Sequence, residues 1–300
     1  RHTIPCVTHA DTHQWTTQSL LSWMTTRFEE HSIDSPRLIS EMLLTHVFGG
    51  ERIDLYANAN RVATEDEREE LRSYVQRTLE HEPVQYIVGK AWFNGIEIAV
   101  NNSTLIPRTC TEVIVDQCLN YCNINSFESP PRIADICTGS GCIAISIALH
   151  AQPCSIVATD ISQEALNLAQ ENAITHGVTE TITCIQGDGI EPIQKLQPFD
   201  VICSNPPYIP DSEMEQLDRN VKEWEPKLAL CGGKNGLQII EPILEQAPEC
   251  LNSGGILLIE LASSIRNQVL EIANSNVELR DATILRDAFG DDRFIRVIKA

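Results

Sequence analysis

The sequence predicts an α/β fold in which helices cover both faces of a mostly parallel sheet, preceded by a small helical domain. Strand and helix patterns alternate from about residue 109 onward, which is typical of a parallel sheet. Residues 16–82, by contrast, show helical periodicity alone. The last two strand patterns, near 281–286 and 293–299, have no helix between them, so they should pair antiparallel as a terminal hairpin.

The N-terminal region reads as amphipathic helices that need a common core. Thr64 and Glu67 form a capping-box pattern that should open the last of them. Apolar residues recur at helical spacing in three groups: Leu20, Leu21, Met24 and Phe28; Leu38, Met42 and Leu43; Leu71, Val75 and Leu79.

A short hairpin is expected between the two regions. Residues 92–98 alternate in polarity around a turn, as two paired strands would. We therefore expect three parts: a helical domain over residues 1–90, a connecting hairpin over 91–108 and a larger domain over 109–300. Strands of the larger domain are expected near 133–136, 155–160, 181–186, 199–204, 255–261, 281–286 and 293–299.

A glycine-rich turn follows the first strand of the larger domain and precedes an apolar helix. Gly139 and Gly141 let the backbone pass close to a ligand, and the helix that opens at Gly141 presents unpaired N–H groups to it. The next strand ends at Asp160, 19 positions after Gly141, where an acidic residue typically binds ribose hydroxyls. The Asp-x-x-x-Gly-x-Gly spacing from Asp135 differs from that of dinucleotide sites. A nucleoside with a small charged tail, such as S-adenosylmethionine, fits better.

The tetrapeptide Asn205-Pro206-Pro207-Tyr208 directly follows the buried strand pattern 199–204. Two prolines stop the strand ladder and fix the backbone just beyond the strand's carboxyl end, which is where ligands bind in open α/β sheets. An Asn amide offers one acceptor and one donor group, which match a planar amide or an exocyclic amine. Asn205, Pro206 and Tyr208 are therefore the catalytic candidates.

At this point the chain resembles the HemK/PrmC family, the N(5)-glutamine methyltransferases of class-1 peptide chain release factors. The resemblance covers roughly residues 18–299 and rests on several motifs in the same order. Besides the glycine turn, Asp160 and the Asn205 tetrapeptide, these are Ile33 to Leu38, Glu41 to Leu44, Glu82 to Gly89, Leu105 to Arg108 with Thr111 and Glu112, and Gly232-Gly233 with Gly236-Leu237.

The resemblance implies a class I S-adenosylmethionine-dependent methyltransferase fold, Rossmann-like, with a seven-stranded sheet, and a release factor as protein substrate. It implies no metal. The candidates for cofactor binding are Asp135, Cys137, Thr138, Gly139, Ser140, Gly141, Asp160, Asp188, Gly189 and Asn205. Asp188 would border the adenine, or else serve as an ordinary turn carboxylate. The candidates for substrate binding are Asn205, Pro206, Pro207, Tyr208, Arg108 and Glu112.

The chain departs from the family pattern in three ways, of which the third bears on the substrate. Cys137 stands where the family commonly has Gly, and Thr109-Cys110 replaces the usual Pro and its neighbour. Lys90 to Phe93 and the glycine turn also resemble a sister enzyme that methylates a ribosomal-protein glutamine. A second alternative is an adenine-N6 nucleic-acid methyltransferase, and a third is a non-catalytic cofactor-binding module.

Charge and composition narrow these alternatives. The formal net charge is −20, from 22 basic and 42 acidic residues, which disfavours a nucleic-acid substrate, because nucleic-acid binding draws on Lys and Arg. The chain has neither a signal-peptide pattern nor an apolar run long enough for a membrane span, so we expect a cytoplasmic protein. Its 11 cysteines include no Cys-x-x-Cys pair, so neither a zinc site nor a disulfide framework is indicated.

Overall fold

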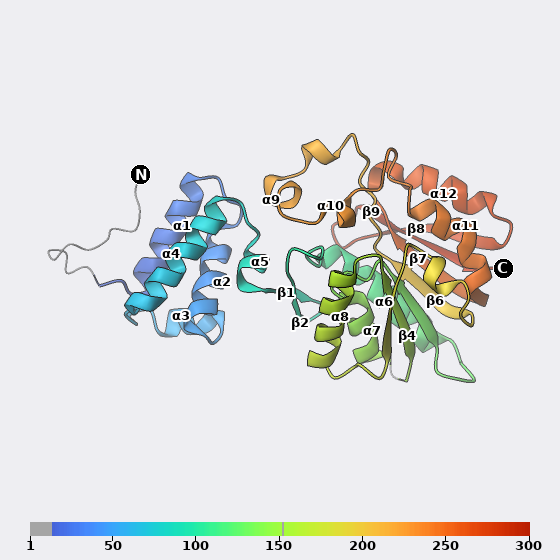
Figure 1. Ribbon diagram of the computed structural model, residues 1–300, viewed down its shortest axis with the longest axis horizontal. Helices are drawn as coiled ribbons and strands as arrows, with labels where there is room; N and C mark the ends of the chain where they lie inside the picture. The colour runs from blue at the N-terminus through green and yellow to red at the C-terminus, as the bar shows by residue number, and fades with distance from the viewer. Residues whose placement is uncertain (1–13, 152) are drawn as a thin grey trace. The chain divides into compact units, whose positions relative to one another are not determined.

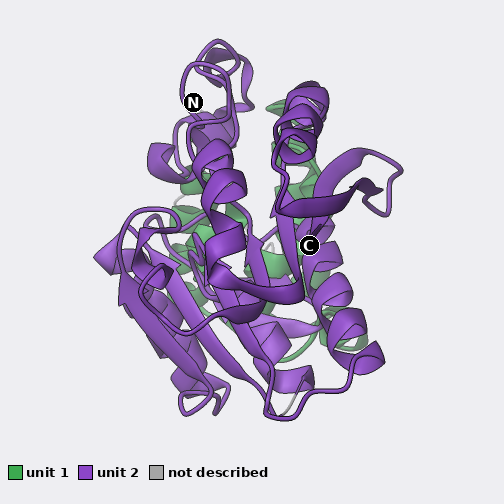
Figure 2. Ribbon diagram, turned by 90° about the vertical axis from the view of Figure 1, so that its right-hand side faces the viewer, with its two compact units in different colours: residues 1–89 green, residues 90–300 purple. Residues whose placement is uncertain are grey.

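The computed structural model describes residues 14–151 and 153–300, which form two compact units divided between Gly89 and Lys90. Figure 1 shows the order of the elements along the chain, and Figure 2 distinguishes the two units by colour. The first 13 residues of the expected 1–90 domain lie outside the described part.

The first unit is a bundle of helices around an apolar core. Met24, Phe28, Leu43 and Leu44 are fully buried in it. Leu38, one of the expected core positions, is 42% exposed instead. Leu43 and Leu44 lie on the face of their helix that packs into the core, whereas Leu38 lies outside that face. The helices are α1 (Thr17–Glu30), α2 (Pro36–Phe48), α3 (Arg52–Ala57), α4 (Glu65–Leu79) and α5 (Val84–Val88).

The predicted capping box at the start of α4 is confirmed. The Glu67 backbone N–H donates to Thr64 Oγ1 at 3.3 Å, and the Thr64 backbone N–H donates to Glu67 Oε2 at 2.8 Å. Two donors that a helix N-terminus would leave unpaired are thereby satisfied.

The second unit contains a seven-stranded sheet with the strand order β5-β4-β3-β6-β7-β9-β8. Neighbours from β5 to β7 are parallel, whereas β9 pairs antiparallel with both β7 and β8. The fold class and terminal hairpin predicted from the sequence are therefore confirmed. The strands are β3 (Arg132–Ile136), β4 (Ser155–Asp160), β5 (Ile182–Gln186), β6 (Phe199–Ser204), β7 (Leu251–Glu260), β8 (Leu279–Arg286) and β9 (Asp292–Lys299).

Helices lie on both faces of this sheet, as Figure 2 shows. α6 (Glu112–Ile124) and α8 (Gln163–Thr175) both pack against α7 (Cys142–His150), and α11 (Ile240–Cys250) packs against α12 (Arg266–Ser275). Short elements complete the unit: η1 (Thr109–Thr111), η2 (Glu191–Ile193), η3 (Met214–Gln216), α9 (Arg219–Lys222), α10 (Lys227–Leu230) and η4 (Ser263–Ile265).

The predicted hairpin is present as β1 (Lys90–Phe93) and β2 (Ile96–Ala99). Its turn residues Asn94 and Gly95 both have positive φ, 48° and 78°, as a two-residue hairpin turn requires. Asn172 of α8 holds the end of β2: its Oδ1 accepts from the Ala99 N–H at 2.9 Å, and its Nδ2 donates to the Ala99 carbonyl at 3.0 Å. The hairpin, which belongs to the second unit, is thus bonded to α8 of the same unit.

The strand order reverses beside β3, because β4 and β5 lie on one side of it and β6 and β7 on the other. In open α/β sheets such a reversal leaves a crevice outside the carboxyl ends of the strands. The segments that follow β3, β4 and β6 meet at this crevice, which is therefore the place to look for a site.

Candidate active site

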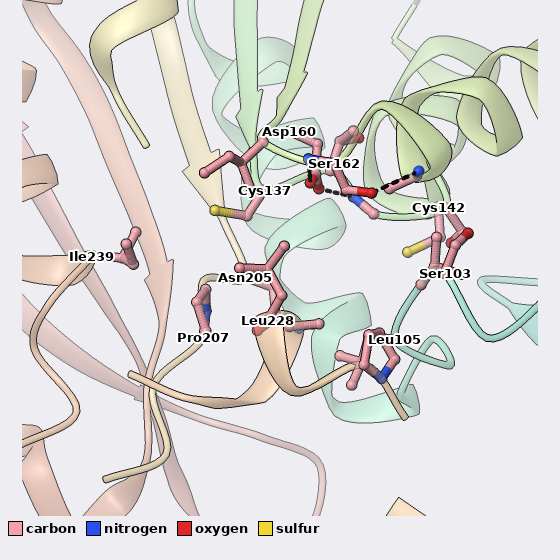
Figure 3. Close-up of a pocket in the computed structure, with 18 of the residues that line it drawn as sticks. Ser103, Leu105, Cys137, Cys142, Asp160, Ser162, Asn205, Pro207, Leu228 and Ile239 are labelled. Atoms are coloured by element: carbon pink, nitrogen blue, oxygen red, sulfur yellow. Dashed lines mark hydrogen bonds between the residues drawn. The ribbon is translucent and has the colours of Figure 1, made fainter. Parts of the chain in front are cut away.

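A cavity of about 370 Å³ lies at the carboxyl ends of the central strands (Figure 3). Predicted site residues from five separate segments line it: the segment before η1, the glycine turn, the end of β4, the loop after β5 and the tetrapeptide after β6. These residues are Arg108, Cys137, Thr138, Gly139, Ser140, Asp160, Asp188, Gly189, Asn205 and Pro207. Asp135, Gly141, Glu112, Pro206 and Tyr208 do not line it.

The glycine turn is built from three residues in the left-handed region. Cys137, Gly139 and Gly141 have φ values of 61°, 56° and 80°. A Cβ at Gly139 would meet nothing within 4 Å, so this glycine serves the backbone conformation. A Cβ at Gly141 would lie 3.1 Å from the Ala169 Cβ, so Gly141 lets the turn pack closely on α8. Cys137 accepts the strained conformation with a side chain that faces the cavity, as Figure 3 shows.

Asp135 supports the turn from beneath. Its side chain is fully buried, and Oδ2 accepts hydrogen bonds from Thr138 Oγ1 at 2.7 Å and from the Ala144 backbone N–H at 3.2 Å. Burial raises the pKa of Asp135 to about 7, while these two bonds act in the opposite direction. Asp135 therefore ties the turn to the first turn of α7 and lies behind the cavity wall.

Asp160 faces the cavity from the end of β4. Its Oδ2 accepts from the Gly139 backbone N–H and its Oδ1 accepts from the Ser162 backbone N–H, both at 2.9 Å (Figure 3). Burial raises the pKa of Asp160, and the backbone bonds oppose this. Each carboxylate oxygen has a second lone pair, so Asp160 can still accept from two vicinal hydroxyl groups of a ligand.

Two side chains, Thr111 and Glu260, hold Asn205 and Tyr208 by hydrogen bonds. The sequence did not predict this role for either of them. Asn205 Nδ2 donates to Thr111 Oγ1 at 3.2 Å, and Thr111 Oγ1 donates to Glu260 Oε2 at 2.6 Å. Tyr208 Oη donates to Glu260 Oε1 at 2.9 Å. Burial raises the pKa of Glu260, and burial together with Glu260 raises that of Tyr208. One sequence signal could have found Glu260: like Asp160, it is a carboxylate that ends a buried strand.

The two remaining substrate candidates have partners within the second unit. Arg108 lines the cavity and forms an ion pair with Glu225, whose side chain is almost fully buried. Glu112 lies elsewhere: its Oε1 accepts from the Asn94 backbone N–H at 2.8 Å, in the turn of the β1–β2 hairpin. The structure therefore brings Arg108 to the cavity and leaves Glu112 at the hairpin.

The loop after α10 fixes the backbone of the tetrapeptide. Ile209 donates to the Leu230 carbonyl at 2.9 Å, and Gly232 donates to the Ile209 carbonyl at 2.8 Å. A Cβ at Gly232 would lie 2.8 Å from the Tyr208 Cα and from its carbonyl carbon. Only glycine allows this approach, because both atoms belong to the backbone and cannot move aside.

Replacing Gly232 with alanine should therefore displace the tetrapeptide. We expect turnover to fall at least about tenfold, with a loss of about 1–3 kcal/mol in the free energy of unfolding, as for other overpacked sites. Gly290→Ala is the matched control. A Cβ there meets nothing within 4 Å, so the only cost of the change is the backbone strain of an alanine at positive φ. Steady-state kinetics and denaturant unfolding of both variants test this. Normal turnover in Gly232→Ala would show that the contact between Gly232 and Tyr208 does not determine the position of the tetrapeptide.

The described part of the chain contains no group of three or more His, Cys, Asp or Glu placed to hold a metal ion. Within that same part, no helix combines the length and apolarity needed to cross a bilayer.

Two family models match the chain: the PrmC N-terminal domain over residues 19–89 and the methyltransferase small domain over residues 123–221. Three curated relatives are named release factor glutamine methyltransferase. The one from Rhodopirellula baltica is 37% identical, covering 95% of this chain and 97% of that protein. The Geobacter sulfurreducens relative is 37% identical, with 94% and 96% covered, and the Chlorobaculum tepidum relative is 36% identical, with 91% and 94% covered. The chain therefore belongs to the release factor glutamine methyltransferase family and is an S-adenosylmethionine-dependent methyltransferase.

Proposed function

We propose that this protein transfers a methyl group to the side-chain amide nitrogen of the glutamine in the Gly-Gly-Gln motif of class-1 peptide chain release factors. One observation carries the proposal beyond family membership. Asn205 lines the cavity at the end of β6 with its NH2 group bonded to Thr111, so its carbonyl oxygen remains to accept from a substrate amide.

Methyl transfer to an amide depends mainly on how the enzyme positions the target nitrogen. A carboxamide nitrogen is a poor nucleophile, because its lone pair is delocalised into the carbonyl group. We propose that Asn205 Oδ1 accepts one N–H of the target amide, that the Pro206 carbonyl accepts the other, and that Tyr208 packs on the amide plane. When bound, S-adenosylmethionine supplies a strongly electrophilic methyl group, so orientation of the nitrogen supplies much of the remaining rate enhancement. A strong general base is not required, because the nitrogen proton becomes acidic on methylation and leaves to solvent.

The other cavity residues fit the cofactor. Asp160 can accept from the ribose hydroxyls, as its remaining lone pairs allow. Asp188 and Gly189, in the loop after β5, are proposed to border the adenine. Thr138 to Gly141 are proposed to pass close to the methionine portion of the cofactor, and Asp135 supports that turn from below. Cys137 adds a thiol to the same wall.

The helical unit is proposed to dock the substrate away from its glutamine. In this division residues 1–90 recognise the release factor, residues 91–108 connect, and residues 109–300 catalyse. Arg108, on the cavity wall, is proposed to contact the substrate near the target side chain. The net charge of −20 favours a protein substrate with basic surface over a nucleic acid.

Methyl transfer from labelled S-adenosylmethionine to three purified candidates tests the proposal. These are a class-1 release factor, the same factor with the Gly-Gly-Gln glutamine replaced by alanine, and a mixture of ribosomal proteins. We expect label on the intact release factor alone. Label on a ribosomal protein would assign the chain to the sister activity, and label that persists without the glutamine would contradict the proposed target.

A further inference from the structure

Glu260 joins three segments that are far apart in the sequence but meet behind Asn205. It ends β7 with its side chain fully buried, and each carboxylate oxygen accepts from a different hydroxyl group. One hydroxyl belongs to Thr111, in η1 before α6, and the other to Tyr208, after β6. Thr111 in turn accepts from Asn205 Nδ2 at 3.2 Å.

The directions of these bonds follow from the chemistry of the groups. An ionised carboxylate only accepts hydrogen bonds, so the single hydroxyl proton of Thr111 points to Glu260. The Thr111 oxygen then has only lone pairs left for Asn205, so it can accept a hydrogen bond from Asn205 but cannot donate one. Asn205 must therefore turn its NH2 group towards Thr111, because the opposite orientation would set its carbonyl oxygen against an acceptor.

A buried carboxylate at this position is not expected to stabilise the fold more than an apolar side chain would. Desolvation of a charge is costly, and apolar groups of similar volume are often as stable. The charges of Arg293 and Arg108 favour the charged form of Glu260, but their ion pairs are with Asp287 and Glu225. The carboxylate instead accepts two hydroxyl hydrogen bonds, one directly from Tyr208 of the tetrapeptide and one from Thr111, which in turn accepts from Asn205.

We propose that Glu260 is a positioning residue for methyl transfer, which fixes the orientation of the Asn205 amide through Thr111 and anchors the Tyr208 hydroxyl directly. This role rests on the proposed function, because it matters for catalysis only if Asn205 receives the target amide. Its consequence is that a carboxylate with no contact to the cavity determines which end of Asn205 faces the substrate.

Two nearly isosteric changes test the relay. Thr111→Val removes the hydroxyl group, and Glu260→Gln leaves one acceptor where there were two. We expect each to lower kcat by about 10- to 100-fold, the range for supporting groups around a site, with the affinity for S-adenosylmethionine within about twofold of wild type. Thr111→Ser restores the hydroxyl group and should restore most of kcat. Thr175→Val on α8 and Glu249→Gln on α11 are exposed controls and should behave as wild type.

A double-mutant cycle separates the relay from a general loss of packing. If Thr111 acts through Asn205, then adding Thr111→Val to Asn205→Ala should cost little further activity, because the group it orients is already gone. Independent, multiplicative losses in the double variant would overturn the proposal. So would a normal kcat in Thr111→Val, or failure of Thr111→Ser to restore it.

A spectroscopic readout keeps this test separate from the identity of the substrate. The side-chain NH2 resonances of Asn205, assigned by their absence in Asn205→Ala, report its bond to Thr111 in the full-length protein without any substrate. They should shift in Thr111→Val and in Glu260→Gln, and stay in place in both controls. Unmoved resonances would overturn the relay. Shifted resonances in a protein that does not methylate release factors would keep the relay and reject the proposed substrate.

Discussion

Asn205→Ala is expected to lower the rate of methyl transfer by at least about 100- to 1,000-fold, comparable with removing one well-placed polar group from other active sites. The affinity for S-adenosylmethionine should stay close to that of wild type. Most of the cavity wall comes from other segments, and the backbone after Asn205 is held by Gly232 and its neighbours. The loss should therefore fall on kcat, because the target amide would keep its binding site but lose the acceptor that orients its nitrogen.

Single-turnover kinetics at saturating cofactor measures this effect, and calorimetry measures cofactor binding. Asn274→Ala on α12 is a matched control, because Asn274 is exposed on the opposite helical layer from α7 and α8. Near-normal turnover in Asn205→Ala would rule out the amide-clamp mechanism. A large loss of cofactor affinity would instead move Asn205 from the substrate to the cofactor.

Asp160→Ala should weaken the binding of S-adenosylmethionine by about 1–3 kcal/mol, which is the range for losing a charge-assisted hydrogen bond and corresponds to about 5- to 150-fold in Kd. The change removes the acceptor for the ribose and also releases the Gly139 and Ser162 N–H groups. Asp160→Asn keeps the size of the side chain and should lie between wild type and Asp160→Ala.

Titration calorimetry of the cofactor tests this prediction, with Asp116→Ala as the control, because Asp116 is an exposed carboxylate on α6. Unchanged affinity in Asp160→Ala would remove Asp160 from the cofactor site. A loss in the control as large as in Asp160→Ala would point to the overall charge of the protein instead.

The parts of the fold that the sequence predicts are those with a local signal. The strand patterns, the Thr64 capping box and the Asn94-Gly95 turn each depend on a few neighbouring residues, and all are present. The position of Asp160 also follows locally, because a carboxylate that ends a strand after a glycine turn has only one edge of the sheet to face.

The features that the sequence did not reveal depend on contacts between distant segments. Thr111 meets Glu260 across 149 positions, and this follows from the packing of η1 near the carboxyl end of β7. Glu225 pairs with Arg108 across 117 positions, because a loop after β6 returns to the cavity wall. No periodicity or spacing encodes such pairs; they arise from the order of the strands and the course of the loops.

Family resemblance has a similar limit. It placed Glu112 beside Arg108 as a substrate candidate, since both belong to one motif. In the structure the Glu112 carboxylate accepts from the Asn94 N–H in the turn of the β1–β2 hairpin, whereas Arg108 lines the cavity. A shared motif therefore does not mean a shared contact, because successive residues of an opening helix point in different directions.

The structure of the full-length protein with S-adenosylhomocysteine and a class-1 release factor tests the central claim most directly. We expect the carboxamide of the Gly-Gly-Gln glutamine to enter the cavity, with its nitrogen within about 3 Å of Asn205 Oδ1, as a hydrogen bond requires. Asn205 Nδ2 should remain on Thr111. If the glutamine bound away from Asn205, or if the Asn205 amide turned its oxygen towards Thr111, the proposed role of Asn205 would be wrong.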